Sequence, residues 1–167
     1  MVYSLRTFIL LFIITLIFAQ DPEGLLSIGE SQLSSGDYTK AELSFNSALQ
    51  ADPSFAPALQ ALSKLQLYKG DLNKANDYSN QAVQADEDFR EWANQIGKII
   101  EHVQNGKRNV QQRMYEEAIA EYDAISQAHP YFPDAEFYKG MTRFRQKDID
   151  EAARHFSNAL NIYPDHA

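Results

Sequence analysis

One phrase recurs four times along the 167-residue chain and strongly limits how the chain can fold. The four copies read GDYTKAELSFNSALQADP, GDLNKANDYSNQAVQADE, RMYEEAIAEYDAISQAHP and KDIDEAARHFSNALNIYP. Their matching alanines, at positions 41, 75, 118 and 152, are 34, 43 and 34 residues apart. A fixed period of this length predicts stacked copies of one supersecondary unit. A single unit leaves an apolar face uncovered, so neighbouring copies must bury it.

Small residues explain how the two halves of each unit pack together. The second half carries the repeated alanine, and the first half carries one of the small residues Gly29, Ser63, Gly106 and Gly140. Side chains of this size allow two antiparallel helices to cross at short distance. Large residues follow the alanines by four positions, and we expect them to fill the space between neighbouring units: Phe45, Tyr122 and Phe156.

Turn residues mark the ends of the predicted helices. Gly36-Asp37 and Gly70-Asp71 predict tight turns within the first two units. Prolines follow three of the second helices, and a proline cannot continue a helical hydrogen-bond ladder: Pro53, Pro130 and Pro164. No segment alternates with the period of a strand. The pattern predicts helices over 23–35, 38–51, 56–69, 72–85, 134–146 and 149–162, with the third unit beginning near 88.

The interval of 43 residues exceeds the repeat period and predicts a nine-residue insertion over 90–98. Between Trp92 and Arg113 one seam of residues steps by four and three, as in a helix. This spacing predicts one long joining helix near 90–114. The dipeptide Asn105-Gly106 is a strong turn signal and leaves a second interpretation open, two helices separated by a bend.

The 34-residue unit, with its small residues and helix-ending prolines, resembles the tetratricopeptide repeat (TPR). The resemblance implies an all-α fold, a right-handed α-solenoid of about four helix–turn–helix units across residues 20–167. The repeats are expected at about 22–55, 56–89, 99–132 and 133–166. Because such arrays bind other proteins on a concave surface, the resemblance also implies a binding module and no enzymatic activity.

The first 19 residues differ in character from the rest. Arg6 precedes an apolar run from Phe8 to Phe18, and the small residue Ala19 closes it. This pattern predicts a secretory signal peptide and a mature protein in the secretory pathway, either in the endoplasmic reticulum lumen or secreted. The alternative is an uncleaved anchor, which would hold the protein at a membrane through residues 1–19.

Composition and motifs exclude several classes of partner and chemistry. The chain has 15 Lys and Arg against 23 Asp and Glu, which argues against binding to nucleic acid or an anionic membrane surface. It has no cysteine, so packing alone must stabilise it. No nucleophile elbow or phosphate-binding loop occurs. Glu151 and His155 have a spacing that suits a metal site, but an ion pair is the expected arrangement. We therefore expect no catalytic residue, cofactor or metal.

Counting along the first helix of three units gives the residues expected to face a concave groove. They are Leu26, Glu30, Leu33, Gln60, Lys64, Leu67, Tyr68, Phe137, Met141, Phe144 and Arg145. Three of them form an apolar stripe at helical spacing, Phe137, Met141 and Phe144. Such a stripe suits a hydrophobic partner segment. It equally suits a face buried in the core.

Many TPR co-chaperones bind an acidic tail through a clamp of Lys, Asn, Asn, Lys and Arg. Leu26, Glu30 and Ala61 stand at three of those places here, so the clamp is absent. A signal segment, TPR units without a clamp and a long joining helix together resemble the TPR part of the lumenal TPR-plus-J-domain co-chaperones of the endoplasmic reticulum. Since no His-Pro-Asp tripeptide occurs, J-domain activity is not implied.

The sequence thus predicts a co-chaperone-like protein–protein interaction module that binds apolar protein segments. The alternative is a membrane-anchored structural subunit of a multiprotein assembly. The last unit ends without a further helix, which would leave Leu160 and Ile162 near solvent. We expect self-association, or a partner, at that face.

Overall fold

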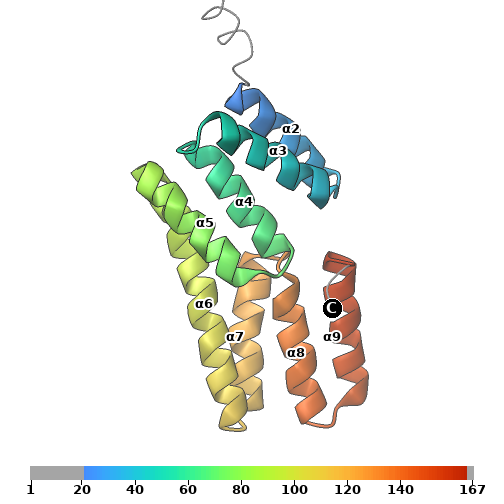
Figure 1. Ribbon diagram of the computed structural model, residues 1–167. Helices are drawn as coiled ribbons and strands as arrows, with labels where there is room; N and C mark the ends of the chain where they lie inside the picture. The colour runs from blue at the N-terminus through green and yellow to red at the C-terminus, as the bar shows by residue number, and fades with distance from the viewer. Residues whose placement is uncertain (1–20, 165–167) are drawn as a thin grey trace, which may run out of the picture.

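A computed structural model describes residues 21–164, whose regular structure is entirely helical (Figure 1). This part of the chain forms eight α-helices and one short 3-10 helix. The helices are α2 (Pro22–Ser34), α3 (Tyr38–Ala51), α4 (Ala56–Tyr68), α5 (Leu72–Ala85), η1 (Glu87–Phe89), α6 (Arg90–Gln111), α7 (Tyr115–Ala128), α8 (Pro133–Arg145) and α9 (Ile149–Ile162). The predicted all-α fold is confirmed, and the predicted helix boundaries are correct to within one residue in the first, second and fourth units.

The same tight turn joins the two helices of every unit. Gly36 and Gly70 adopt φ angles of 80° and 79°, and Arg113 and Lys147 adopt 61° and 67° at the matching places. Glycine tolerates this left-handed conformation without steric cost, whereas arginine and lysine adopt it less readily. In three units an aspartate follows the turn and caps the second helix. Its side chain accepts a hydrogen bond from a backbone N–H of that helix.

Helix α6 is continuous over its 22 residues, whereas α2, α4 and α8 have 13 residues each. Asn105 and Gly106 lie within it, so the alternative of a bend at this dipeptide is wrong. The predicted span of 90–114 is too long, because α6 ends at Gln111 and Arg113 forms the turn. The additional residues between the second and third units therefore lengthen one helix.

The large residues after the alanines pack against a glycine of their own unit. Phe45 and Tyr122 also share a buried cluster with residues of the next unit, as predicted. A Cβ atom on Gly29 would lie 2.4 Å from the Phe45 ring, and one on Gly106 would lie 2.4 Å from the Tyr122 ring. The corresponding distance from Gly140 to Phe156 is 2.6 Å. Real Cβ atoms do not approach other atoms this closely. Each glycine is therefore required by the aromatic ring that lies against it.

The second unit solves the same packing problem with polar side chains. Serines, Ser63 and Ser79, replace the glycine and the aromatic residue. The Ser63 hydroxyl donates to the carbonyl of Ala75 at 2.6 Å and accepts a hydrogen bond from Trp92 Nε1 at 2.8 Å. Since Trp92 lies in the first turn of α6, the lengthened helix is tied directly to the second unit.

Two hydrophobic clusters hold the array together. The smaller joins the first and second units and contains Ala41, Phe45, Ala61, Leu62 and Leu65. The larger joins the second, third and fourth units and contains Leu67, Ala75, Ile96, Ile99, Val103, Ala118, Tyr122, Ile125, Phe132 and Ala135. Every neighbouring pair of units therefore shares buried apolar surface, as a solenoid requires.

The array curves so that its first and last units meet. Figure 1 shows α6 to α9 side by side, with α2 and α3 lying obliquely above them. The ring centroids of Tyr38 and Tyr163 are 5.4 Å apart, and those of Tyr68 and Tyr131 are 5.3 Å apart. These aromatic pairs connect the first two units to the last unit and to the loop before it.

None of the helices between residues 21 and 164 is both long and apolar enough to span a membrane. The segment 1–19, predicted to be a signal peptide or an anchor, lies outside the described residues.

Two glycines of α6 allow a matched test of the close packing. Gly106→Ala should lower the free energy of unfolding by about 1–3 kcal/mol, because the new methyl group overlaps the buried Tyr122 ring. Gly97→Ala meets nothing within 4 Å and should stabilise the protein by about 0.5–1 kcal/mol through helix propensity. Urea denaturation followed by circular dichroism measures both. If both substitutions stabilise equally, the Gly106–Tyr122 contact does not limit packing.

Candidate functional site

A groove runs between α6 and α8 and consists of two adjoining hollows. The larger, of about 630 Å³, lies between the α4–α5 turn, the middle of α6 and the start of α8. The smaller, of about 310 Å³, lies between the end of α6 and the rest of α8. Both hollows are lined by Lys107, Phe137 and Tyr138, so we treat them as one surface, the α6–α8 groove.

The smaller hollow has a mainly apolar lining with cationic side chains on it, whereas the lining of the larger hollow is more polar than apolar. Ile100 and Val110 line the groove from α6, and Phe137 and Met141 line it from α8. The Lys107 ammonium lies 4.7 Å from the centroid of the Tyr138 ring, a cation–π distance. Arg145 lines the smaller hollow near the end of α8.

The two tyrosines of the groove stay protonated at physiological pH. Burial raises the pKa of Tyr122 to about 12, although the Arg145 cation opposes this shift. Burial, followed by the nearby Asp134 carboxylate, raises the pKa of Tyr138 well above its ordinary value. The Tyr138 hydroxyl donates to Asp134 Oδ2 at 3.1 Å. Both phenols therefore act as neutral, polar edges of an apolar surface.

The predicted residues of the last unit divide between two surfaces. Phe137, Met141 and Arg145 line the groove. Phe144 is exposed but is not among the lining side chains. Phe137 also packs against Phe156 of α9, with ring centroids 5.7 Å apart. The apolar stripe is therefore partly core and partly surface.

The predicted residues of the first two units do not line the α6–α8 groove. Leu26 and Leu33 pack against the smaller hydrophobic cluster. Leu67 is only 1% exposed within the larger cluster, so its prediction as a surface residue is wrong. Helical spacing identifies a face of a helix, but the stacking of the next unit decides whether that face is covered.

The other four predicted residues lie at separate places. Lys64 lies 5.6 Å from the centroid of the Trp92 ring, and Tyr68 packs against Tyr131. Gln60 is half-buried, and Glu30 is exposed. The structure therefore gathers no single surface from all four units.

The third unit supplies groove residues that the sequence analysis missed. Counting from residue 99 with the spacing used for the other units gives Ile100, Val103, Lys107, Val110 and Gln111. All five line the groove. The sequence did contain the information needed to predict them, because the repeated alanine Ala118 shows where the third unit begins and ends. Tyr138 and Tyr122 had no such signal, because they lie outside the positions that were counted as groove-facing.

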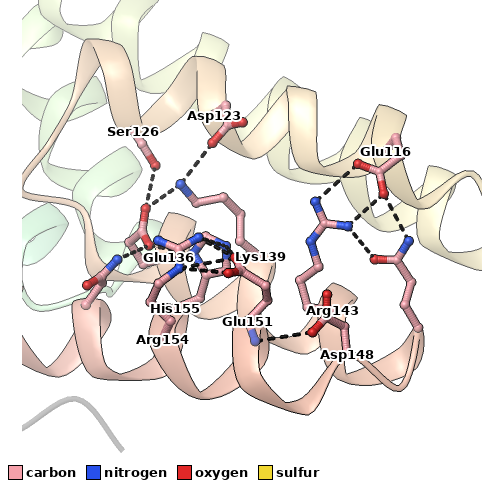
Figure 2. Close-up of polar contacts among 12 residues, drawn as sticks. Glu116, Asp123, Ser126, Glu136, Lys139, Arg143, Asp148, Glu151, Arg154 and His155 are labelled. Atoms are coloured by element: carbon pink, nitrogen blue, oxygen red, sulfur yellow. Dashed lines mark hydrogen bonds and ion pairs between the residues drawn. The ribbon is translucent and has the colours of Figure 1, made fainter.

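On its other side, α8 is held by a polar network with α7 and α9 (Figure 2). The buried Lys139 ammonium lies 2.9 Å from Asp123 Oδ1 and also pairs with Glu136. The buried His155 contributes its Nδ1 atom at 2.8 Å from Glu136 Oε2, and Asn158 donates to the same oxygen at 3.1 Å. A buried charge is tolerated only when it is paired in this way. The network thus fixes the helix that carries half of the groove.

A second set of polar contacts holds the far end of α8. Arg143 donates to both carboxylate oxygens of Glu116 at 2.7 and 3.2 Å, and Gln146 donates to Glu116 at 3.0 Å. Hydrogen bonds from Arg143, then from Gln146, lower the pKa of Glu116. These contacts join α7 to the end of α8 (Figure 2).

The expected ion pair between Glu151 and His155 is present, but His155 makes a shorter contact with Glu136. Its closest approach is 3.9 Å, longer than the 2.8 Å between His155 and Glu136. Among residues 21–164, no group of three or more His, Asp or Glu side chains is arranged to hold a metal ion.

Glu136 gives the network a defined pH dependence. Burial by itself raises the pKa of Glu136, but hydrogen bonds from His155, Lys139 and Asn158 outweigh it and lower the pKa from 4.5 to about 2. A depressed pKa in the folded state means that ionised Glu136 stabilises the fold above pH 4.5, and that this stability is lost as the pH falls toward 2.

Glu136→Gln should therefore flatten the loss of stability between pH 4.5 and 2. At pH 7 it should cost about 1–3 kcal/mol, because a buried charged partner is removed. Urea denaturation at a series of pH values measures both effects. An unchanged pH dependence in the variant would contradict the assignment.

Comparison with known proteins places the chain in a family. Two models described as "Tetratricopeptide repeat" match residues 22–55 and 133–166. The crystal structure of the P58(IPK) TPR domain superposes with a TM-score of 0.66 at 18% identity, covering 87% of this chain. The chain spans 42% of the length of that domain, so the likeness concerns the fold.

More distant likenesses include a thermophilic TPR protein of Thermus thermophilus, with a TM-score of 0.46 at 19% identity and coverage of 86% of this chain and 75% of that one. YrrB, a TPR protein with an unusual peptide-binding site, has a TM-score of 0.43 at 19% identity, with coverage of 87% and 88%. No curated protein matches the chain. The repeat models and the shared helical array together show that the chain is a tetratricopeptide repeat protein, whose repeats form a protein–protein interaction module.

Proposed function

We propose that the protein binds apolar segments of other proteins in the α6–α8 groove, as a co-chaperone-like module of the secretory pathway. The observation that carries this proposal is the apolar lining of the smaller hollow of the groove, with Met141 exposed on it. Apolar surface contributes about 25 cal/mol per Å² when it is buried, so such a lining favours apolar side chains over charged ones.

The shape and charges of the groove support a protein segment as the ligand. The groove extends along two neighbouring helices and is open to solvent, which suits an extended or helical segment. Lys107 and Arg145 are placed to hydrogen-bond backbone carbonyls or an acidic residue beside the apolar anchor. An acidic tail without apolar residues would leave the lining uncovered.

The proposed co-chaperone-like role rests on three features. The sequence begins with a signal-like segment, lacks the clamp for acidic tails and supplies an apolar groove. The likeness to the P58(IPK) TPR domain supports the fold of this module and does not bear on its client. Without a His-Pro-Asp tripeptide in the chain, recruitment of an Hsp70 by this segment is not proposed.

Groove binding can be tested with two labelled peptides of equal length, one rich in leucine and one with Asp or Glu in place of each leucine. Fluorescence anisotropy should show that the leucine-rich peptide binds more tightly and that salt affects its affinity little. Met141→Asp should weaken this binding roughly tenfold, because it places a charge against the apolar anchor. Leu43→Asp, at an exposed position on α3 outside the groove lining, is the matched control. Tighter binding of the acidic peptide, or normal binding by the Met141 variant, would overturn the proposal.

A second candidate function is a membrane-anchored structural subunit of a multiprotein assembly. The apolar run Phe8–Phe18 favours it, because an uncleaved segment would hold the array at a membrane. The two functions predict different mature N-termini. N-terminal sequencing of the natural protein should give a chain beginning near Gln20 if the secretory proposal is correct. A chain that retains residues 1–19 would favour the anchored subunit.

A further inference from the structure

The smaller hollow of the α6–α8 groove differs in charge from the chain as a whole. Lys107 and Arg145 line it, and no aspartate or glutamate does. The chain, by contrast, has 23 Asp and Glu against 15 Lys and Arg. In the larger hollow two carboxylates, Asp71 and Asp134, accompany the lysines of the lining. Positive charge without an acidic counterpart is therefore confined to the end of the groove where α6 and α8 finish.

Arg145 is not neutralised by a neighbouring carboxylate. Within residues 21–164 it forms no ion pair, and neither does Lys107, whose ammonium lies on the Tyr138 ring. The nearby Asp148 accepts a hydrogen bond from the backbone N–H of Glu151 and does not line the hollow. The Arg145 guanidinium is thus available to a bound anion.

A buried tyrosine adds a hydrogen-bond donor to the same hollow. Tyr122 is only 1% exposed, yet it lines the hollow, and its hydroxyl makes no hydrogen bond within residues 21–164. The one side-chain nitrogen or oxygen there that is both fully enclosed and unpaired is Arg143 Nε, so the Tyr122 oxygen must be open to the hollow. An unpaired hydroxyl on a buried side chain loses free energy that a ligand can restore.

The charges near this hydroxyl favour an anion. Arg145 is close enough to oppose the rise that burial causes in the pKa of Tyr122. Glu121 adds to that rise, but its carboxylate lies 2.6 Å from His102 and does not line the hollow. The Tyr122 phenol stays protonated at physiological pH and can donate.

We propose that the segment bound in the groove carries an Asp or Glu side chain beside its apolar anchor, and that Tyr122 and Arg145 bind this carboxylate. The inference rests on the proposed function, whose ligand class it narrows. The hydroxyl donates one hydrogen bond and the guanidinium donates two, and hydrogen bonds to an ionised group are the stronger kind. The apolar anchor packs on the apolar side chains of the same hollow: Val110, Phe137 and Met141.

The spacing along α8 sets the spacing of the ligand. Phe137, Met141 and Arg145 follow one another at intervals of four residues, which is about 6 Å along a helix axis. Side chains on one face of an extended segment recur every two residues, at about 6.6–6.8 Å. The carboxylate should therefore follow the last apolar residue by two positions in an extended segment, or by four positions in a helical one.

A side-chain carboxylate suits this place better than the carboxylate of a chain terminus. No residue of the α8–α9 turn lines the hollow, so the described part of the chain forms no wall beyond Arg145. A bound segment can continue past it. The two donors belong to the third and fourth units, away from Leu26, Glu30 and Ala61, where the clamp for acidic tails is missing.

Three labelled, leucine-rich peptides of equal length, acetylated and amidated at their ends, test the inference. One carries only glutamines after its last leucine, and the other two have glutamate at the second or the fourth position after it. At low salt one glutamate peptide should bind roughly tenfold more tightly than the glutamine peptide in fluorescence anisotropy. This advantage should shrink as salt is added, because salt screens the ion pair. Equal binding of all three overturns the inference and leaves groove binding intact, whereas no binding by any peptide overturns both.

Variants of the two donors test the assignment. Tyr122→Phe removes only the hydroxyl, so it should bind the glutamine peptide normally and reduce the advantage of the glutamate peptide roughly threefold or more. Arg145→Gln should abolish most of that advantage. Lys98→Gln, which removes an exposed charge of α6 outside both hollows, is the matched control and should leave it unchanged.

Two further measurements can overturn the assignment. Urea denaturation of Tyr122→Phe without peptide should match the wild-type protein, since the hydroxyl has no partner to lose; a clear loss of stability, or an unchanged advantage of the glutamate peptide, would contradict the role of Tyr122. The glutamine peptide should bind equally with a free and an amidated C-terminus. Tighter binding by the free form, with no effect of an internal glutamate, would assign the hollow to a chain terminus instead.

Discussion

In three of the four units, an aromatic ring from the second helix lies against a glycine of the first helix. Because the glycine has no side chain, the two helices cross closely enough for the ring to be enclosed. This contact sets the angle and distance of the helix pair and hence the shape of the surface that the next unit must cover. A chain of such pairs is stable only when neighbouring copies bury that surface.

The second unit departs from this arrangement, and the departure determines the shape of the molecule. Serines replace both the glycine and the aromatic residue, and Ser63 binds Trp92 from the lengthened helix α6. The longer helix separates the first two units from the last two. A groove that joins three units therefore lies between α6 and α8, with the α4–α5 turn at one end.

Helix α8 has a different role on each of its sides. One side lines the groove, a second is fixed to α7 and α9 by Glu136, Lys139 and His155, and a third carries the exposed Phe144. Because these buried charges are paired, the helix has little freedom to shift. The polar network thus holds the groove-lining side of α8 in place.

The sequence by itself determined the local structure. The aligned alanines, the turn glycines and the prolines specified the helices, their order and the TPR fold, because these features depend on backbone conformation and on contacts within one unit. Only the tertiary structure decided which helix faces remain exposed. Leu26 and Leu67 have the same spacing as groove residues and yet are packed in cores, whereas Ile100 and Lys107 of the third unit line the groove. Helical periodicity specifies a direction around one helix axis, but exposure depends on which neighbouring unit packs against that face, and this packing joins residues far apart in the sequence.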